Sequence, residues 1–85
     1  MVMSEEIRSE IQQIEAYLTG LGWSFVAKCN CGGRYQKKYN KGNYRLVYMP
    51  TRRQFIILKN NIRITRLDDS IDNLEQVLQE HGLTD

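Results

Sequence analysis

The fold is decided at residues 20–31, which read GLGWSFVAKCNC. Before this stretch apolar residues recur every three or four positions, whereas from Trp23 onward they alternate with other residues. The first spacing is typical of an amphipathic helix and the second of a strand. Gly20 and Gly22 are suited to end the helix, because glycine readily adopts the left-handed backbone found there. We therefore predict a helix over about residues 4–20 and a strand over about residues 23–31.

The N-terminal segment has a polar start and one apolar side. Ser4 can cap the helix, and Glu5 and Glu6 in its first turn complement the positive end of the helix dipole. The apolar side consists of Ile7, Ile11, Ile14 and Leu18. Such a helix has one face to bury.

Turn signals divide the region after residue 31 into four further segments. These signals are Gly32-Gly33, residues 40–43, residues 50–53 and Asn60-Asn61. The segments between them predict strands over about residues 34–40, 44–49, 54–59 and 62–66. Short consecutive turns favour an antiparallel meander.

The C-terminal segment predicts a second helix over about residues 69–81. Asp68 or Asp69 can cap it, and His81-Gly82-Leu83 contains the glycine of a Schellman C-terminus. A chain of 85 residues has room for one core. We predict a single α+β domain over residues 1–85, in the order α-β-β-β-β(-β)-α, with both terminal helices packed on one face of the sheet.

Strand alternation predicts which side chains meet the helices. On that side we expect Trp23, Phe25, Ala27, Leu46, Tyr48, Phe55, Ile57, Ile62 and Ile64. On the other side we expect Lys28, Arg45, Arg63 and Thr65, with Val26, Val47 and Met49. The segment 34–40 is polar on both sides, which is typical of an edge strand protected by charge.

The two signs of charge are separated along the chain. None of the ten Asp and Glu residues lies between Ala16 and Leu67, whereas all of the basic residues except Arg8 do. Four of the five tyrosines, Tyr35, Tyr39, Tyr44 and Tyr48, are interleaved with the basic residues of this interval. Cations that follow phosphates and rings that stack on bases are the combination that binds single-stranded nucleic acid.

The charge pattern predicts a non-catalytic module that binds single-stranded or structured RNA or DNA through a basic, tyrosine-bearing sheet. Both helices would repel phosphate, so no recognition helix for a major groove is expected. The candidate binding residues are Lys28, Arg34, Lys37, Lys38, Arg45, Arg52, Arg53, Arg63, Tyr35, Tyr39 and Tyr44.

A second interpretation stays open, namely a small structural or interaction protein. Its basic sheet would dock on an acidic protein partner, or on the acidic helices of another copy. Val26, Val47 and Met49 on the open side favour this interpretation, because an apolar centre with a charged rim is typical of protein interfaces.

Signals for other chemistry are weak. His81 stands alone, without the nucleophile and orienting group that catalysis needs, so no enzyme is expected. Cys29 and Cys31 lack the further ligands of a zinc site and are interpreted as small core residues. We expect no cofactor, metal or small-molecule substrate. We also expect no signal peptide, because Glu5 and Glu6 stand where one would carry basic residues, and no membrane span, because the apolar runs are short. The expected location is the cytoplasm.

Three short segments carry a likeness to a known family. They are residues 18–23 (LTGLGW), 32–35 (GGRY) and 78–83 (LQEHGL). Their succession resembles the HicA-type toxins, a family with a small double-stranded-RNA-binding-like fold that cleaves RNA with a histidine after the first hairpin. The resemblance implies that an α-β-sheet-α domain of this kind can serve RNA. No histidine lies near Gly33 or Arg34, so no residue of this chain corresponds to the catalytic histidine of the family. This chain also has two more predicted strands than the family pattern.

Overall fold

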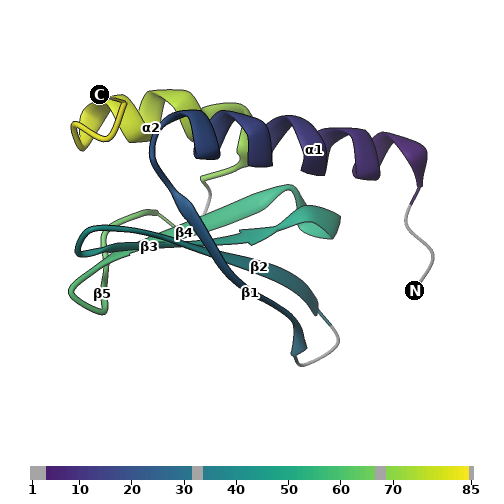
Figure 1. The fold of residues 1–85 in the computed structure, drawn as a ribbon, viewed down its shortest axis with the longest axis horizontal. Helices are drawn as coiled ribbons and strands as arrows, with labels where there is room; N and C mark the ends of the chain where they lie inside the picture. The colour runs from purple at the N-terminus through teal and green to yellow at the C-terminus, as the bar shows by residue number, and fades with distance from the viewer. Residues whose placement is uncertain (1–3, 32–33, 67–68, 85) are drawn as a thin grey trace.

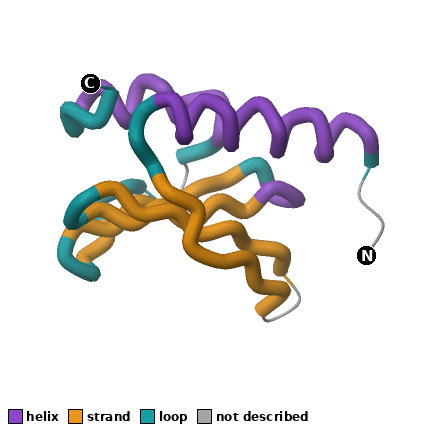
Figure 2. Tube along the Cα trace, viewed as in Figure 1, coloured by secondary structure: helices purple, strands orange, loops and turns teal. Residues whose placement is uncertain are grey.

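The computed structural model describes residues 4–31, 34–66 and 69–84. Figure 1 shows a sheet with both helices on the same side of it, and Figure 2 shows the same two layers by secondary structure. The elements are α1 (Glu5–Gly20), β1 (Ser24–Cys31), β2 (Arg34–Lys41), β3 (Tyr44–Met49), the 3-10 turn η1 (Pro50–Arg52), β4 (Gln54–Lys59), β5 (Ile62–Arg63), the 3-10 turn η2 (Ile71–Asn73) and α2 (Leu74–Glu80). The predicted α+β class, element order and placement of the helices are confirmed.

The strands form one antiparallel sheet in the order β1-β2-β3-β4-β5. The prediction that residues 34–40 form an edge strand is therefore wrong, because β2 lies between β1 and β3. The polar character of β2 is explained by contacts that its lysines make with other elements. Lys37 pairs with Glu15 of α1, and the Lys41 Nζ donates to the carbonyl oxygen of Leu83 at 3.2 Å.

Both helix ends follow their sequence signals. The Ser4 Oγ accepts a hydrogen bond from the Ile7 amide at 3.3 Å, which caps α1. After α1, Gly22 adopts a φ of 94° and the Trp23 amide donates to the Leu18 carbonyl at 3.0 Å. After α2, Gly82 adopts a φ of 68°, and an equivalent bond closes the predicted Schellman end.

The start of the second helix differs from the prediction. The α-helical part begins at Leu74, after η2, and not near residue 69. The Asp69 carboxylate accepts from the Arg66 amide at 2.8 Å, so it closes the preceding turn and does not cap a helix. Asp68 and the Gly32-Gly33 turn lie outside the described residues.

The fifth strand is shorter than predicted, ending at Arg63 instead of Arg66. Asn60 and Asn61 form the expected turn, with φ values of 53° and 67°. Past the strand, the Ile64 amide still donates to the Ile57 carbonyl, at 2.9 Å. The Ile57 amide, however, donates to the Thr65 Oγ1 at 3.3 Å. A side-chain hydroxyl thus replaces the backbone acceptor that would have continued the strand.

The core lies between the sheet and the helices. Its buried side chains are Leu18, Trp23, Tyr39, Leu46, Tyr48, Phe55, Ile57, Ile71, Leu74, Val77, Leu78 and Leu83. Leu46, Tyr48, Phe55 and Ile57 face the helices as predicted, since they belong to this cluster.

A β-bulge in β1 reverses the expected faces of the residues that follow Phe25. The pairing shifts between Phe25, which lies opposite Tyr39, and Ala27, which lies opposite Lys38. After the shift Lys28 lies opposite Lys37, so Lys28 is on the helix-facing side and not on the open one as predicted.

Three residues expected to pack toward the helices are exposed instead. Phe25, Ala27 and Ile62 belong to the two edge strands, and the exposed fractions of Phe25 and Ile62 are 49% and 69%. Met49, expected to be open to solvent, is buried. The interpretation of Cys29 as a small core residue is also wrong, because Cys29 is only partly buried and is disulfide-bonded.

Candidate nucleic-acid interface

The open face is the sheet face turned away from α1 and α2. Opposed residues of antiparallel strands project to the same side, so the pairing places its side chains in rows. One row contains Lys38, Val47 and Ile56, and the next contains Asn40, Arg45, Leu58 and Arg63. Aliphatic side chains that are half-buried thus form the centre, and cations lie beside them.

Two further arginines adjoin this face at a groove. Arg52 of η1, Arg63 of β5 and Arg66 line a cavity of about 300 Å³ with Met49, Gln54 and Ile56. Gln54 and Ile56 belong to the open side of β4, so the groove continues the same face. We call Lys38, Arg45, Arg52, Arg63 and Arg66 the open-face cations.

Arg66 was missed as a candidate residue. A strand continuing to residue 66 would project Arg63 and Arg66 to opposite sides, because alternate residues of a strand share a side. Because β5 ends at Arg63, strand alternation does not apply to Arg66, and both arginines line the same groove.

The open-face cations make no ion pair with the residues that the structure describes. The Arg45 Nε donates to the Asn40 Oδ1 and the Arg63 Nε to the Thr65 carbonyl, each at 3.2 Å. These bonds orient two guanidinium groups and leave their charges uncompensated. Arg45, Arg52, Arg63 and Arg66 are exposed, and Lys38 is partly exposed.

The predicted tyrosines lie on the opposite side of the sheet. Tyr39 faces the helices opposite Leu46 and is buried, and Tyr44 packs against the core with the Lys59 Nζ over its ring, 5.5 Å from the centroid. Tyr35 is half-buried and shares their side of β2. The expectation of one surface carrying both tyrosines and cations is therefore wrong.

Lys37 is likewise turned toward the helices. Its Nζ pairs with the Glu15 carboxylate of α1 and lies 5.3 Å from the centroid of the Phe25 ring. Lys37 is 9% exposed. This predicted binding residue instead holds α1 on β2.

Arg53 is held in an internal clamp. It adopts a left-handed φ of 51°, and its guanidinium contacts Glu10 of α1 at 3.1 Å and Asp72 of η2 at 2.8 Å. The Ile71 amide donates to the Arg53 carbonyl at 2.9 Å. Arg53 thus joins α1, the sheet and η2, and its charge is compensated by two carboxylates.

Two predicted cations remain outside these groups. Lys28 is exposed on the helix-facing side of β1. The side chain of Arg34 is not among those described. Of the eleven predicted residues, the open face brings together Lys38, Arg45, Arg52 and Arg63.

The clamp predicts an acid-dependent loss of stability. The hydrogen bond and charge of Arg53 lower the pKa of Asp72 below its ordinary value of 3.8. A carboxylate with a lowered pKa stabilises the fold above its unfolded-state pKa, and this contribution disappears as the pH falls through the folded-state pKa. Asp72→Asn should therefore melt below wild type at pH 7, and the difference should vanish toward pH 2. A Glu75→Gln control removes a carboxylate that makes no ion pair with a described residue. A difference in melting temperature that is independent of pH would contradict the clamp.

Two buried tyrosines predict delayed ionisation in alkali. Burial, with the nearby charges of Glu15 and Glu10 respectively, raises the pKa of Tyr39 and of Tyr48 above the ordinary value of 10.0. A tyrosine whose pKa is raised by folding stabilises the fold below pH 10. This contribution is lost as the pH rises toward the pKa of the folded state. Their phenolate absorbance should appear together with the loss of helical circular dichroism. The Tyr39→Phe/Tyr48→Phe variant should lack that delayed phase, and full ionisation of a still helical protein would contradict the assignment.

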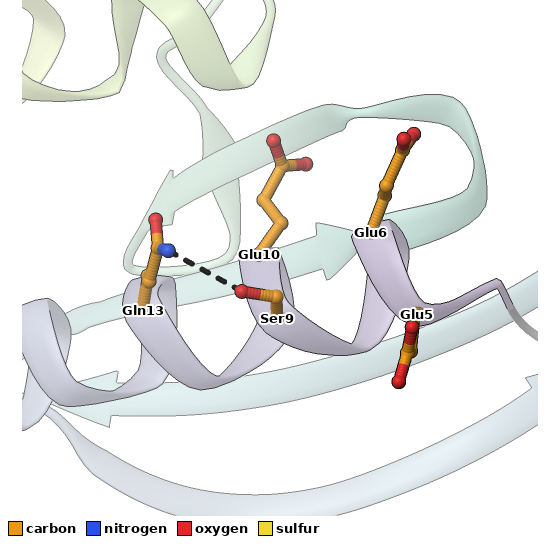
Figure 3. Close-up of a pocket in the computed structure, with 5 residues that line it drawn as sticks. All are labelled: Glu5, Glu6, Ser9, Glu10 and Gln13. Carbon is orange, nitrogen blue, oxygen red and sulfur yellow. Dashed lines mark hydrogen bonds between the residues drawn. The ribbon is translucent and has the colours of Figure 1, made fainter.

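Acidic residues gather on α1, in the other layer. Figure 3 shows Glu6 and Glu10 projecting from one side of the helix, and Gln13 donating to the Ser9 Oγ at 3.4 Å. A phosphate chain would be repelled from this side. These glutamates and the open-face cations thus lie in different layers of the molecule.

Other candidate chemistry finds little support in the described residues. His81 lines a cavity of about 140 Å³ with Arg66, Asp69 and Glu80, between α2 and the segment after β5. The described ranges contain no group of three or more His, Cys, Asp or Glu able to hold a metal ion. Within the same ranges, no helix has the length and apolar character needed to cross a bilayer.

Comparison of the chain with protein-family models, with curated proteins and with solved structures finds no match.

Proposed function

We propose that the open face binds single-stranded or structured nucleic acid without catalysing a reaction on it. The observation that carries the proposal is the set of five open-face cations, none of which makes an ion pair with a described carboxylate. Each can neutralise one phosphate and release its counterions. The cations used inside the fold, such as Lys37 and Arg53, contrast with this set.

Base contact must then come from groups other than tyrosine. Val47, Ile56 and Leu58 provide an aliphatic centre between the cations. Arginine guanidinium planes can stack on unpaired bases, and Arg45 is oriented by its bond to Asn40. We expect weak base preference, because none of these contacts reads a specific base edge.

The arrangement of the cations fits a strand that crosses the sheet. Arg45 and Arg63 flank Leu58 in one row and lie two strands apart, which is about 10 Å at the usual strand spacing. Lys38 lies in the next row, and Arg52 and Arg66 lie at the groove. This spread of charge suits an extended, flexible backbone.

Binding is tested with an internally labelled single strand, the matching duplex and poly-glutamate at 0.15 M salt. The proposal expects the single strand to bind and poly-glutamate to compete poorly. An RNA strand incubated with the protein should stay intact. Absence of binding by both nucleic acids would overturn the proposal.

A second candidate function is docking on an acidic protein or on another copy. The aliphatic centre of Val47, Ile56 and Leu58 with cations around it favours this alternative, since protein interfaces share this anatomy. Mass measured in solution at low and high salt separates the two. Association that weakens with salt would support contact between copies, whereas a monomer at both salts would count against it.

A further inference from the structure

We propose that the groove of Arg52, Arg63 and Arg66 binds the terminal phosphate of a nucleic-acid strand. The inference rests on the proposed function and adds to it the part of the strand that is anchored. The groove has a volume of about 300 Å³ and contains three cations from three separate segments, namely η1, β5 and the residues after β5.

The charge of the groove fits a phosphomonoester better than a phosphodiester. A terminal phosphate carries close to two negative charges at neutral pH, whereas an internal phosphodiester carries one. Three guanidinium groups offer several donors in the planar geometry that suits phosphate oxygens. No Asp or Glu is among the residues that line the groove. Asp69 and Glu80 lie on the other side of Arg66, in the cavity that it shares with His81.

The position of the groove fits the end of a strand. β5 is the last strand of the sheet and has only two residues, so the open face ends there. A strand that runs from Lys38 or Arg45 across the centre reaches Arg63 at this margin. Beyond Arg63 the chain turns through Arg66, whose amide donates to Asp69. The margin is thus where a bound strand would end.

The remaining lining residues suit the sugar and base attached to that phosphate. Met49 and Ile56 provide apolar contact, and the Gln54 side chain carries both a donor and an acceptor. Gln54 is only partly buried, so it is accessible to a base edge. Anchoring would therefore include one terminal nucleotide.

The test compares oligonucleotides of one sequence that differ only at their ends. Each carries an internal fluorophore and a 5′-phosphate, a 3′-phosphate, a 5′-methyl phosphate or hydroxyls at both ends. Fluorescence anisotropy at 0.15 M salt should show about tenfold tighter binding for one of the two phosphate-ended strands. The methyl phosphate, which carries a single charge, should lose most of this preference if the 5′ end is bound.

Two variants place the effect at the groove. Arg52→Gln/Arg66→Gln should abolish the preference, while the strand with hydroxyl ends should still bind, about 15-fold more weakly, as expected for the loss of two of the five open-face cations near 0.15 M salt. Lys38→Gln/Arg45→Gln removes the same charge outside the groove, and it should weaken all four strands by a common factor while keeping the preference.

Equal affinity for the phosphate-ended and hydroxyl-ended strands would overturn the terminal-phosphate site and leave the proposed function standing. A preference that survives in Arg52→Gln/Arg66→Gln would overturn its assignment to this groove. Failure of all four strands to bind would overturn the proposed function and, with it, this inference.

Discussion

Replacing Arg45 and Arg63 with glutamine is expected to weaken single-strand binding about 15-fold near 0.15 M salt. The two arginines flank Leu58 on the open face and pair with no described carboxylate. Removing two of about five phosphate contacts should also change the slope of log K against log salt from roughly −3.5 to about −2.1. Titrations of wild type and variant over a salt series measure both quantities.

The control removes the same charge from other positions. Arg8 is exposed on α1, and Lys59 lies on the helix-facing side of β4 opposite Tyr44. Arg8→Gln/Lys59→Gln should retain affinity within about twofold and keep nearly the wild-type slope, since long-range charge is screened within roughly 8–10 Å. Equal losses in the two variants would show that net charge, and not the open face, governs binding.

Phe55→Ala is expected to cost about 3–5 kcal/mol of the free energy of unfolding. Phe55 is 1% exposed and lies in the core between the sheet and the helices, opposite Tyr48. A chain of 85 residues typically has about 4–13 kcal/mol in total. The variant should therefore unfold at a much lower urea concentration, or be largely unfolded without urea.

Phe25→Ala provides the matched control for this loss. Phe25 is 49% exposed on edge strand β1, where its ring packs edge-on against Tyr39 with centroids 5.6 Å apart. Its removal should cost about 1 kcal/mol, the scale of one aromatic pair and one cation–π contact. Similar losses from both variants, measured by urea unfolding, would contradict the assigned core.

Much of the fold follows from local sequence signals. The change of spacing at Trp23, the glycines at 22 and 82 and the asparagines at 60 and 61 placed helix ends and turns correctly, because each acts through backbone geometry near its own position. The antiparallel order followed from the short turns. The start of α2 was misplaced since Asp69 has a competing local use, namely closing the turn at Arg66.

The faces of the strands were harder to predict. One bulge at Phe25–Ala27 exchanges the sides of β1, and the sequence carries no glycine there to signal it. The polar pattern of β2 was ambiguous because Lys37 and Lys41 bond to partners far away in the sequence, Glu15 and Leu83. Tertiary contacts of this kind decide which face a polar residue occupies.

The candidate site was predicted in part for the same reason. Four of the cations predicted from the acid-free residues 17–66, namely Lys38, Arg45, Arg52 and Arg63, lie on or beside one face of the sheet. Composition could not separate them from Lys37 and Arg53, whose charges are used against helix carboxylates. It also could not place the tyrosines, since tyrosine suits both a packed core and an exposed sheet.

The salt dependence of binding between the wild-type protein and a labelled single strand tests the central claim most directly. If the five open-face cations each neutralise a phosphate, the slope of log K against log salt is roughly −3.5, and affinity falls about a hundredfold between 0.05 and 0.2 M salt. Absence of binding at 0.05 M salt, or an affinity that hardly changes across the series, would contradict a nucleic-acid interface on the open face.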